Sequence, residues 1–279
     1  MNWSKSMDCH QFKEIAKLLR KNVLEAIYYG GSGHPGGSLS LADIMAVLYG
    51  EKLNIDPKNP KAENRDRVVL SKGHAAPILY ASLAYKGFFK EEELKKLRHI
   101  DSFLQGHPEM KHTPGVDMTT GSLGQGISAA CGMALGLKKK NSSARVYAII
   151  GDGEMEEGQV WEALMFANQY KLSNLTIILD FNKLQIDGST SEVMDVDNPA
   201  ERFKDFHLNC IEIDGHNYEQ IANAIDADRN CSDKATVIVA HTIKGKGVSF
   251  MENQVNWHGK APTKEELSKA LEELDHEGK

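Results

Sequence analysis

An acidic residue between two glycines and a later asparagine are the side chains best suited to hold a metal ion and a diphosphate. Asp152 directly follows the apolar run 145–151, and Asn182 follows the apolar run 175–180. Neighbouring parallel strands end side by side at the rim where α/β proteins bind ligands. Carboxylate and amide oxygens suit Mg²⁺, which often shares its ligands with phosphates, and glycines let the backbone approach a diphosphate. The alternative is a tight turn and an unrelated asparagine.

Four histidines lie in loops that are rich in glycine and proline: His34, His74, His107 and His258. A single histidine is more often structural than functional. Loops at one rim of a sheet converge, however, so four such histidines favour a shared site. Imidazole can hydrogen-bond sugar hydroxyls, bind phosphate and transfer protons near neutral pH.

Acidic residues begin the helix that we expect after Asp152. For Glu154 and Glu156, the favourable interaction with a helix N-terminus is a sufficient explanation. Glu157 could instead reach across an interface between chains. The lysine- and glycine-containing segment 244–247 lacks the spacing and the Ser/Thr of a Walker phosphate loop. We interpret it as a loop near the site with structural glycines.

The elements that must position these residues alternate between strand and helix. Apolar runs predict strands at residues 66–71, 145–151, 175–180, 208–213 and 235–240. Helical periodicity predicts helices at residues 12–27, 39–49, 75–85, 91–99, 121–137, 218–227 and 263–275, and we expect loops at 32–38, 101–121, 182–199 and 249–262. This alternation predicts an α/β fold, a doubly wound parallel sheet flanked by helices, in one domain over residues 1–279.

Composition limits the classes of partner and compartment. The chain has 279 residues, 41% of them hydrophobic, which suffices for the core of one α/β domain. The net charge is −6 and no basic block stands out, which argues against nucleic acid as a partner. The 4 cysteines show no CxxC spacing, so we expect reduced thiols in the cytoplasm. No secretory signal is evident in residues 1–13, and no segment predicts a membrane span.

Several segments, taken together in their order and spacing, resemble the transketolase family. They are residues 32–36, 70–74, 106–109, 119–126, 151–153 with Glu157, 182–188 and 257–259. The resemblance implies a thiamine-diphosphate-binding fold, in its diphosphate-binding (PP-type) form. It also implies an enzyme that transfers a two-carbon ketol unit from a ketose phosphate to an aldose phosphate, as in the pentose phosphate pathway.

The resemblance implies a role for particular residues as well. The metal ligands would be Asp152, Asn182 and the backbone carbonyl of Leu184, which would bind Mg²⁺ or, in its place, Ca²⁺ or Mn²⁺. The residues around thiamine diphosphate would come from several loops: His74, Gly121, Leu123, Gly153, Ile186 and His258. Of these, His74, Gly153 and His258 would contact the diphosphate, Gly121 and Leu123 would flank the aminopyrimidine, and Ile186 would support the bent cofactor.

The catalytic residues that the resemblance implies lie toward the sugar and toward a second chain. His34, His107 and His258 would face the sugar and stabilise charge on its oxygens. Glu157 would lie at a chain interface, linked to the activating glutamate of the partner. One small departure from the family pattern is Ser122, where many full-length transketolases have proline.

A larger departure is length, because full-length transketolases continue through a pyrimidine-binding and a C-terminal domain. We therefore expect the N-terminal subunit of a split transketolase, inactive alone and joined by a C-terminal subunit in a heterotetramer. Alternatives are a subunit that acts on an unusual sugar, or one similar to 1-deoxyxylulose-5-phosphate synthase or to 2-oxoacid decarboxylases. A non-catalytic binding module is a further alternative. A Rossmann dehydrogenase is disfavoured, because no GxGxxG follows a first strand.

Overall fold

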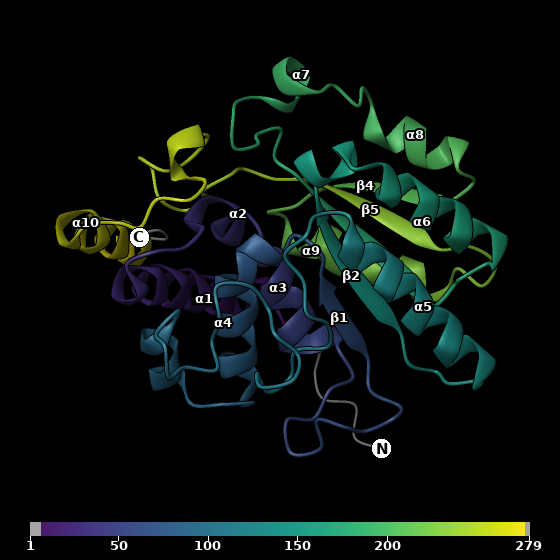
Figure 1. The fold of residues 1–279 in the computed structure, drawn as a ribbon, viewed down its shortest axis with the longest axis horizontal. Coiled ribbons are helices and arrows are strands. Elements are labelled where there is room, and N and C mark those ends of the chain that lie inside the picture. Colours follow the sequence, from purple (N-terminus) through teal and green to yellow (C-terminus); the bar gives the residue numbers. More distant parts are fainter. Residues whose placement is uncertain (1–6, 277–279) are drawn as a thin grey trace.

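The computed structural model describes residues 7–276, and it contains one five-stranded parallel sheet (Figure 1). Residues 1–6 and 277–279 lie outside the described part, so the ends of the predicted domain and the first part of segment 1–13 stay predictions. The strands are β1 (Arg67–Leu70), β2 (Val146–Gly151), β3 (Leu175–Phe181), β4 (Asn209–Asp214) and β5 (Thr236–His241). Their order across the sheet is β1-β2-β3-β5-β4. The predicted parallel α/β fold is confirmed.

Both faces of the sheet are covered, which explains why its strands are apolar almost throughout. In β2, Tyr147 and Ile149 belong to one buried cluster, and Val146, Ala148 and Ile150 belong to the other. Alternate residues of a strand point to opposite faces, so each strand contributes to two cores at once.

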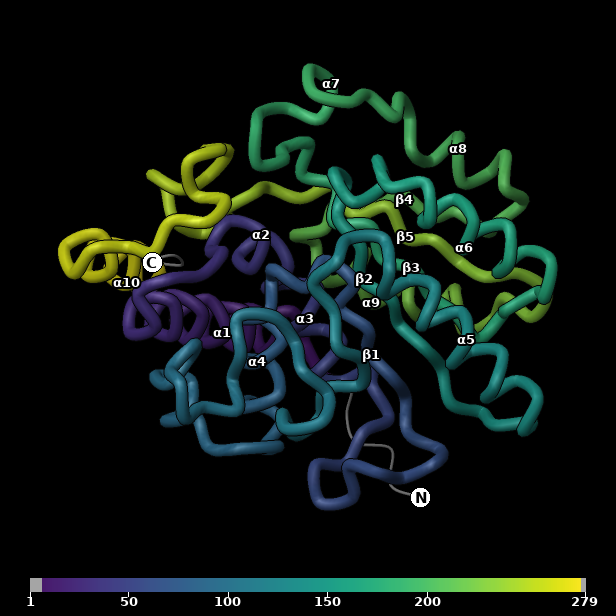
Figure 2. The backbone as a smooth tube through the Cα atoms, viewed as in Figure 1, coloured from purple at the N-terminus to yellow at the C-terminus, as the bar shows by residue number. Residues whose placement is uncertain are grey.

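Helices from both ends of the chain contribute to the buried cluster on the first face. They are α1 (Cys9–Gly30), α3 (Ala42–Val47), α4 (Ala76–Lys86), α9 (Tyr218–Arg229) and α10 (Lys264–His276), of which α10 packs against α1. The second face carries α5 (Gln125–Lys139), α6 (Gly158–Gln169) and α8 (Pro199–Asp205). The tube in Figure 2 shows the yellow C-terminal helix α10 beside the purple helix α1. Among residues 7–276, no helix combines the length and apolar character that crossing a bilayer requires.

The predicted helix at the C-terminal end is confirmed together with its cap. The backbone N–H of Thr263 donates to Glu266, and the backbone N–H of Glu266 donates to the Thr263 hydroxyl at 3.2 Å. This reciprocal pair is the capping box that the sequence predicts.

The region after α1 differs from the prediction of a loop followed by one long helix. A short helix, α2 (Pro35–Leu39), lies within the predicted loop, because Pro35 provides the φ angle of a first helical turn. The predicted helix 39–49 is divided into α3 and the π-helix η1 (Leu48–Lys52). Between α2 and α3, the Ser40 hydroxyl hydrogen-bonds with Asp180 at 2.6 Å, which ties the break to the sheet.

Three further segments differ from the prediction. Residues predicted as a helix at 91–99 form a shorter 3₁₀ helix, η3 (Glu91–Lys96), in which only Leu94 is buried. The helix predicted from 121 begins later, because Gly121 and Gly124 have positive φ angles. In the predicted loop after β3 lies α7 (Thr190–Val193), followed by the unpredicted α8, whose first turn is capped by the side chain of Asn198.

Candidate functional site

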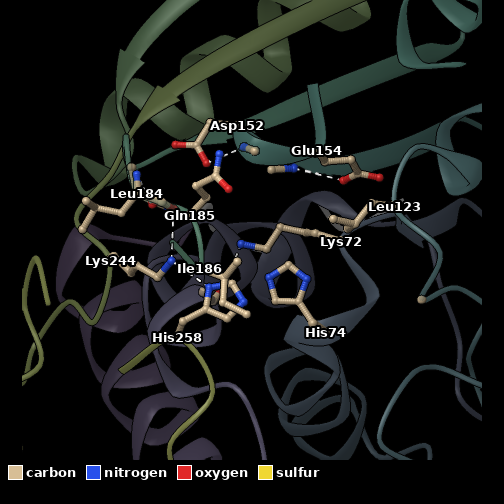
Figure 3. Close-up of a pocket in the computed structure, with 15 residues that line it drawn as sticks. Lys72, His74, Leu123, Asp152, Glu154, Leu184, Gln185, Ile186, Lys244 and His258 are labelled. Atoms are coloured by element: carbon tan, nitrogen blue, oxygen red, sulfur yellow. Dashed lines mark hydrogen bonds between the residues drawn. The ribbon is translucent and has the colours of Figure 1, made fainter. Parts of the chain in front are cut away.

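A cavity opens at the carboxyl ends of β1, β2, β3 and β5, where several predicted loops converge (Figure 3). Predicted residues that line it are His74, Gly121, Leu123, Asp152, Gly153, Asn182, Leu184, Ile186 and His258. Lining residues that the sequence does not single out as site residues are Gly37, Lys72, Gly151, Glu154, Gln185 and Lys244. His34 and His107 lie beside this set through ring contacts, whereas Glu157 is exposed at the start of α6.

Asp152 directly follows β2 and is almost completely buried. One carboxylate oxygen accepts the backbone N–H of Gly153 at 2.9 Å, and the other accepts the backbone N–H of Lys183. Burial, and then the charge of nearby Asp180, raises the pKa of Asp152 to about 6. A carboxylate held in such a place is stabilised by a bound cation.

Asn182 and Leu184 follow β3 and contribute neutral oxygens to the same cavity. The Asn182 side-chain nitrogen donates to Asp180 at 3.3 Å, and its oxygen accepts the backbone N–H of Leu184 at 3.2 Å. The carbonyl of Leu184 accepts a hydrogen bond from the Lys244 ammonium at 3.0 Å. This carbonyl therefore already holds a cationic group.

Within residues 7–276, no cluster of three or more His, Cys, Asp or Glu side chains could hold a metal ion. The predicted ligand set has one carboxylate, one amide and one carbonyl, and is of a different kind. Hard oxygen ligands of this kind, few in number, suit an ion that also binds phosphate oxygens. The metal assignment stays a prediction, and the donor chemistry is compatible with it.

Two lysines give the cavity its positive charge, and neither is marked as a site residue by the sequence pattern. Lys72 is 1% exposed, pairs with Asp180, and donates to the carbonyl of Gly37 at 3.0 Å. Lys244 contacts the Leu184 carbonyl and His258, as Figure 3 shows. Burial, followed by the charge of Lys72, lowers the pKa of Lys244 to about 8. The two ammonium groups together favour an anionic ligand.

The four histidines predicted to share a site are brought together. The ring centroids of His34 lie 5.3 Å from His74, 6.4 Å from His107 and 5.5 Å from His258, and His74 stacks on His258 at 5.1 Å. Burial lowers the pKa of each, to about 4 for His34 and about 3 for His258. The cluster is thus neutral near pH 7, and it can donate or accept hydrogen bonds without adding charge.

The edges of the cavity are apolar where the sequence predicts contact with an aromatic ring. Leu123 is 36% exposed and Ile186 is 61% exposed, although both are large hydrophobic side chains. Gly121 has a φ of 151°, and a Cβ there would lie 3.2 Å from the His107 ring. The face of an aromatic ring held between these edges would cover apolar surface that is open to water in the isolated chain.

Glu154 does more than favour a helix N-terminus, so the interpretation from sequence is wrong for this residue. Its buried carboxylate accepts hydrogen bonds from the Ser71 hydroxyl, from the Gly124 backbone at 2.8 Å and from the Gly151 backbone at 3.1 Å. It therefore joins the ends of β1 and β2 to the loop before α5. The sequence does not reveal this role. Glu154 lies between Asp152 and Glu157, and all three are acidic residues near the start of a helix, so the pattern does not distinguish them.

The cavity fits a diphosphate together with a divalent ion. Within the described residues, Lys244 has no carboxylate within ion-pair distance, and the buried Nδ1 of His34 has no hydrogen-bond partner. A Cβ at Gly37 would lie 3.2 Å from the Lys72 ammonium and 3.4 Å from His74 Nε2, so the glycine keeps this space open. An ammonium group that lacks a carboxylate partner and lines an open space is typical of a site for an anion.

Comparison with known proteins supports a site for thiamine diphosphate. Residues 11–278 match the model of the transketolase thiamine-diphosphate-binding domain. The chain belongs to the transketolase family. It is 45% identical over 263 residues to the 6-deoxy-6-sulfo-D-fructose transketolase subunit SqwG of Clostridium sp. (strain MSTE9), covering 94% of this chain and 96% of that one. It is 39% identical over 255 residues to one subunit of the apulose-4-phosphate transketolase of Phocaeicola vulgatus, covering 91% of this chain and 90% of that one.

Solved transketolase structures have the same fold over this region. The transketolase of Campylobacter jejuni superposes with a TM-score of 0.91 at 34% identity, covering 96% of this chain and 43% of that one. The Campylobacter jejuni chain is longer than the present chain. The Clostridium and Phocaeicola subunits, in contrast, have nearly the same length as the present chain. The predicted family and fold are therefore confirmed, and the roles of individual residues stay predictions.

Proposed function

We propose that this chain is the N-terminal subunit of a split transketolase that depends on thiamine diphosphate and Mg²⁺. Together with a C-terminal subunit, it transfers a two-carbon ketol unit from a ketose phosphate to an aldose phosphate. The observation that carries the proposal is the cavity in which Lys72, Lys244 and His74 face Asp152 and Asn182. This combination of cationic and oxygen groups is matched by a diphosphate bridged to a divalent ion.

In this proposal, different residues of the chain hold different parts of the cofactor. Asp152, Asn182 and the Leu184 carbonyl would hold the ion. Lys244 would release the Leu184 carbonyl, and both lysines would bind the diphosphate. Leu123 would flank the aminopyrimidine together with Gly121, and Ile186 would support the bent cofactor. When bound, thiamine diphosphate supplies the carbanion-stabilising chemistry that ketol transfer requires.

The histidine cluster binds and orients the sugar in this proposal. His34, His107 and His258 carry lowered pKa values, so they meet the sugar hydroxyls and carbonyl as neutral hydrogen-bonding groups. A well-placed donor of this kind stabilises developing negative charge by about 2.7–4 kcal/mol.

The partner in this proposal is a C-terminal transketolase subunit that carries the pyrimidine-binding domain, in a heterotetramer with two chains of each kind. Relatives of nearly equal length are named transketolase subunits, which supports an assembly of separate chains. The exposed Glu157 at the N-terminus of α6 is then available to the partner's activating glutamate. All four cysteines are free, as expected for the cytoplasmic compartment that we propose.

A second candidate differs in substrate only. The two relatives that match this chain in length are named for 6-deoxy-6-sulfo-D-fructose and for apulose-4-phosphate, which are unusual sugars with a sulfonate or a phosphate. The histidine cluster suits the hydroxyl groups of any such sugar. Release of the shorter aldose from xylulose 5-phosphate, or from a sulfonated ketose, measured with the C-terminal subunit present, separates the two candidates.

Cofactor binding tests the proposal directly. Asp152→Ala or Asn182→Ala should abolish the Mg²⁺-dependent binding of thiamine diphosphate in isothermal titration calorimetry. The matched control is Asp195→Ala, which removes an exposed carboxylate from the loop after β3. Affinity unchanged in the Asp152 and Asn182 variants would contradict the metal assignment, and ketol transfer by the chain alone would contradict the split arrangement.

A further inference from the structure

Beside the proposed metal ligands lies a buried carboxylate that no sequence motif singles out. Asp180 is 0% exposed, in β3 between β2 and β5. Four donors surround it: the Lys72 ammonium, the Ser40 hydroxyl at 2.6 Å, the Thr242 hydroxyl and the Asn182 side-chain nitrogen at 3.3 Å. These donors come from segments that follow β1, β3, β5 and α2. The side chain of Asp180 therefore joins most of the loops that surround the cavity.

The contact between Asp180 and Asn182 determines which atom of the amide faces which neighbour. A carboxylate among four donors can only accept hydrogen bonds, so it selects the nitrogen of the amide. The amide oxygen then lies on the opposite side, where it accepts the backbone N–H of Leu184. The orientation follows from two independent partners, which is the basis on which oxygen and nitrogen of an amide are assigned.

This orientation matters for a metal site because the two ends of an amide are not equivalent. The oxygen of an amide binds Mg²⁺ or Mn²⁺, whereas the NH₂ group offers no ligand to a hard cation. An Asn182 side chain rotated by half a turn would present its NH₂ group to the ion. Groups that orient the ligands of a metal ion typically change its affinity about 10–100-fold when they are removed.

We propose that Asp180 is a positioning residue, which holds the Asn182 amide so that its oxygen faces the divalent ion. This inference rests on the proposed function, because it assumes that Asn182 is a ligand. Asp180 itself is not among the residues that line the cavity. A simpler role would be to anchor Lys72 and the neighbouring loops, and an experiment must separate orientation from anchoring.

A double-mutant cycle separates the two roles. Asn182→Asp introduces a carboxylate whose two oxygens are equivalent, so its orientation no longer matters. In the wild-type background this change adds a negative charge that a bound cation compensates, so it should raise the affinity for Mn²⁺. In the Asp180→Asn background it should raise the affinity by a much larger factor, because it also restores the oxygen ligand: the introduced amide at position 180 donates to one oxygen and leaves the other for the ion.

The measurement is the dissociation constant of Mn²⁺, read by electron paramagnetic resonance with saturating thiamine diphosphate and the C-terminal subunit present. Asp180→Asn alone should weaken Mn²⁺ binding at least tenfold. Adding Asn182→Asp should restore affinity to within about threefold of the wild type. An effect of charge alone would make Asn182→Asp raise the affinity by the same factor in both backgrounds, and equal factors in the two backgrounds would therefore overturn the inference.

Thr242→Val is the matched control, because it removes another hydrogen bond of Asp180 without touching Asn182. Thermal unfolding should show a loss of stability in this variant, with Mn²⁺ affinity unchanged. If Asp180→Asn does not fold alone, the same cycle is measured in a Lys72→Met background, which removes the ammonium that Asp180 would leave unpaired; equal factors there overturn the inference, and a larger factor beside Asp180→Asn supports it. A wild-type complex that shows no Mn²⁺ binding with thiamine diphosphate would overturn the proposed function itself.

Discussion

The two ends of the sheet differ in whether their buried charges have partners of opposite charge. At the amino ends of the strands, cations and carboxylates are matched: Arg145 lies 2.7 Å from Asp228, and Arg65 pairs with Asp117. At the carboxyl ends, Asp180 matches Lys72, but the contacts of Lys244 are a carbonyl and an imidazole. The ammonium group of Lys244 thus has no carboxylate partner among the described residues.

The difference teaches how to distinguish charges that hold the fold from charges that hold a ligand. In a buried ion pair each member supplies the countercharge of the other, which offsets part of the cost of removing both from water. An ammonium group that contacts only neutral acceptors is compensated incompletely, as the lowered pKa of Lys244 records. A bound anion supplies the missing charge. The unmatched end is therefore where a diphosphate should bind.

The largest effect should follow from breaking a matched pair at the amino end. Arg145→Met leaves the fully buried carboxylate of Asp228 without its cation, and this should lower the free energy of unfolding by about 3–5 kcal/mol. The affinity of the folded chain for thiamine diphosphate should not change. Urea unfolding and calorimetry check the two parts, and a loss of cofactor affinity without loss of stability would break the comparison.

A smaller effect, of the opposite kind, should follow at the carboxyl end. Lys244→Met should weaken the binding of thiamine diphosphate about tenfold or more, since hydrogen bonds with charged groups contribute about 1.5–3 kcal/mol. Stability should stay equal or rise, because an incompletely compensated charge is removed. Lys246→Met, two residues away and paired with Glu252 at the surface, is the control and should leave binding unchanged. A large loss of stability in Lys244→Met would contradict the assignment of this charge to a ligand.

The smallest effect concerns pH. Burial, then Arg98, lowers the pKa of His34 from 6.5 to about 4, so the unfolded chain binds a proton that the folded chain does not between these values. Stability should therefore be complete above pH 6.5 and should fall as the pH drops toward 4. His34→Gln should make the midpoint of thermal unfolding less dependent on pH in this range. If NMR shows that the His34 ring titrates near pH 6.5, neither burial nor Arg98 lowers its pKa in the folded chain, and the prediction is wrong.

Most of the fold could be predicted because its signals are local. Apolar runs mark all five strands, and the periodicity of residues 12–27 and 218–227 marks α1 and α9. The errors concern segments whose conformation depends on distant contacts. Glycines at 36 and 37 predict a loop, yet they are helical after Pro35, and glycine is required there because Lys244 and Lys72 leave room for little more than a hydrogen.

The site could be predicted only where chemistry and loop position coincide. The glycine-flanked Asp152 and the four loop histidines satisfy both conditions, and all of them lie in or beside the cavity. Lys72, Glu154 and Asp180 do not satisfy them, because lysine and acidic residues are common on surfaces and nothing local shows that these are buried. Lys244 lies in a segment that the sequence places near the site, but nothing in that segment shows that its charge is unmatched.

By itself the sequence determined the parallel sheet, the family, and the residue types that meet at one rim, because strand ends and glycine-rich loops are encoded by near neighbours. Only the tertiary structure decided which charges are matched and which are left for a ligand. Matching is a property of pairs such as Lys72 and Asp180, whose members lie 108 positions apart in the chain. No local pattern specifies such a pair, because it forms only when the strands are placed side by side.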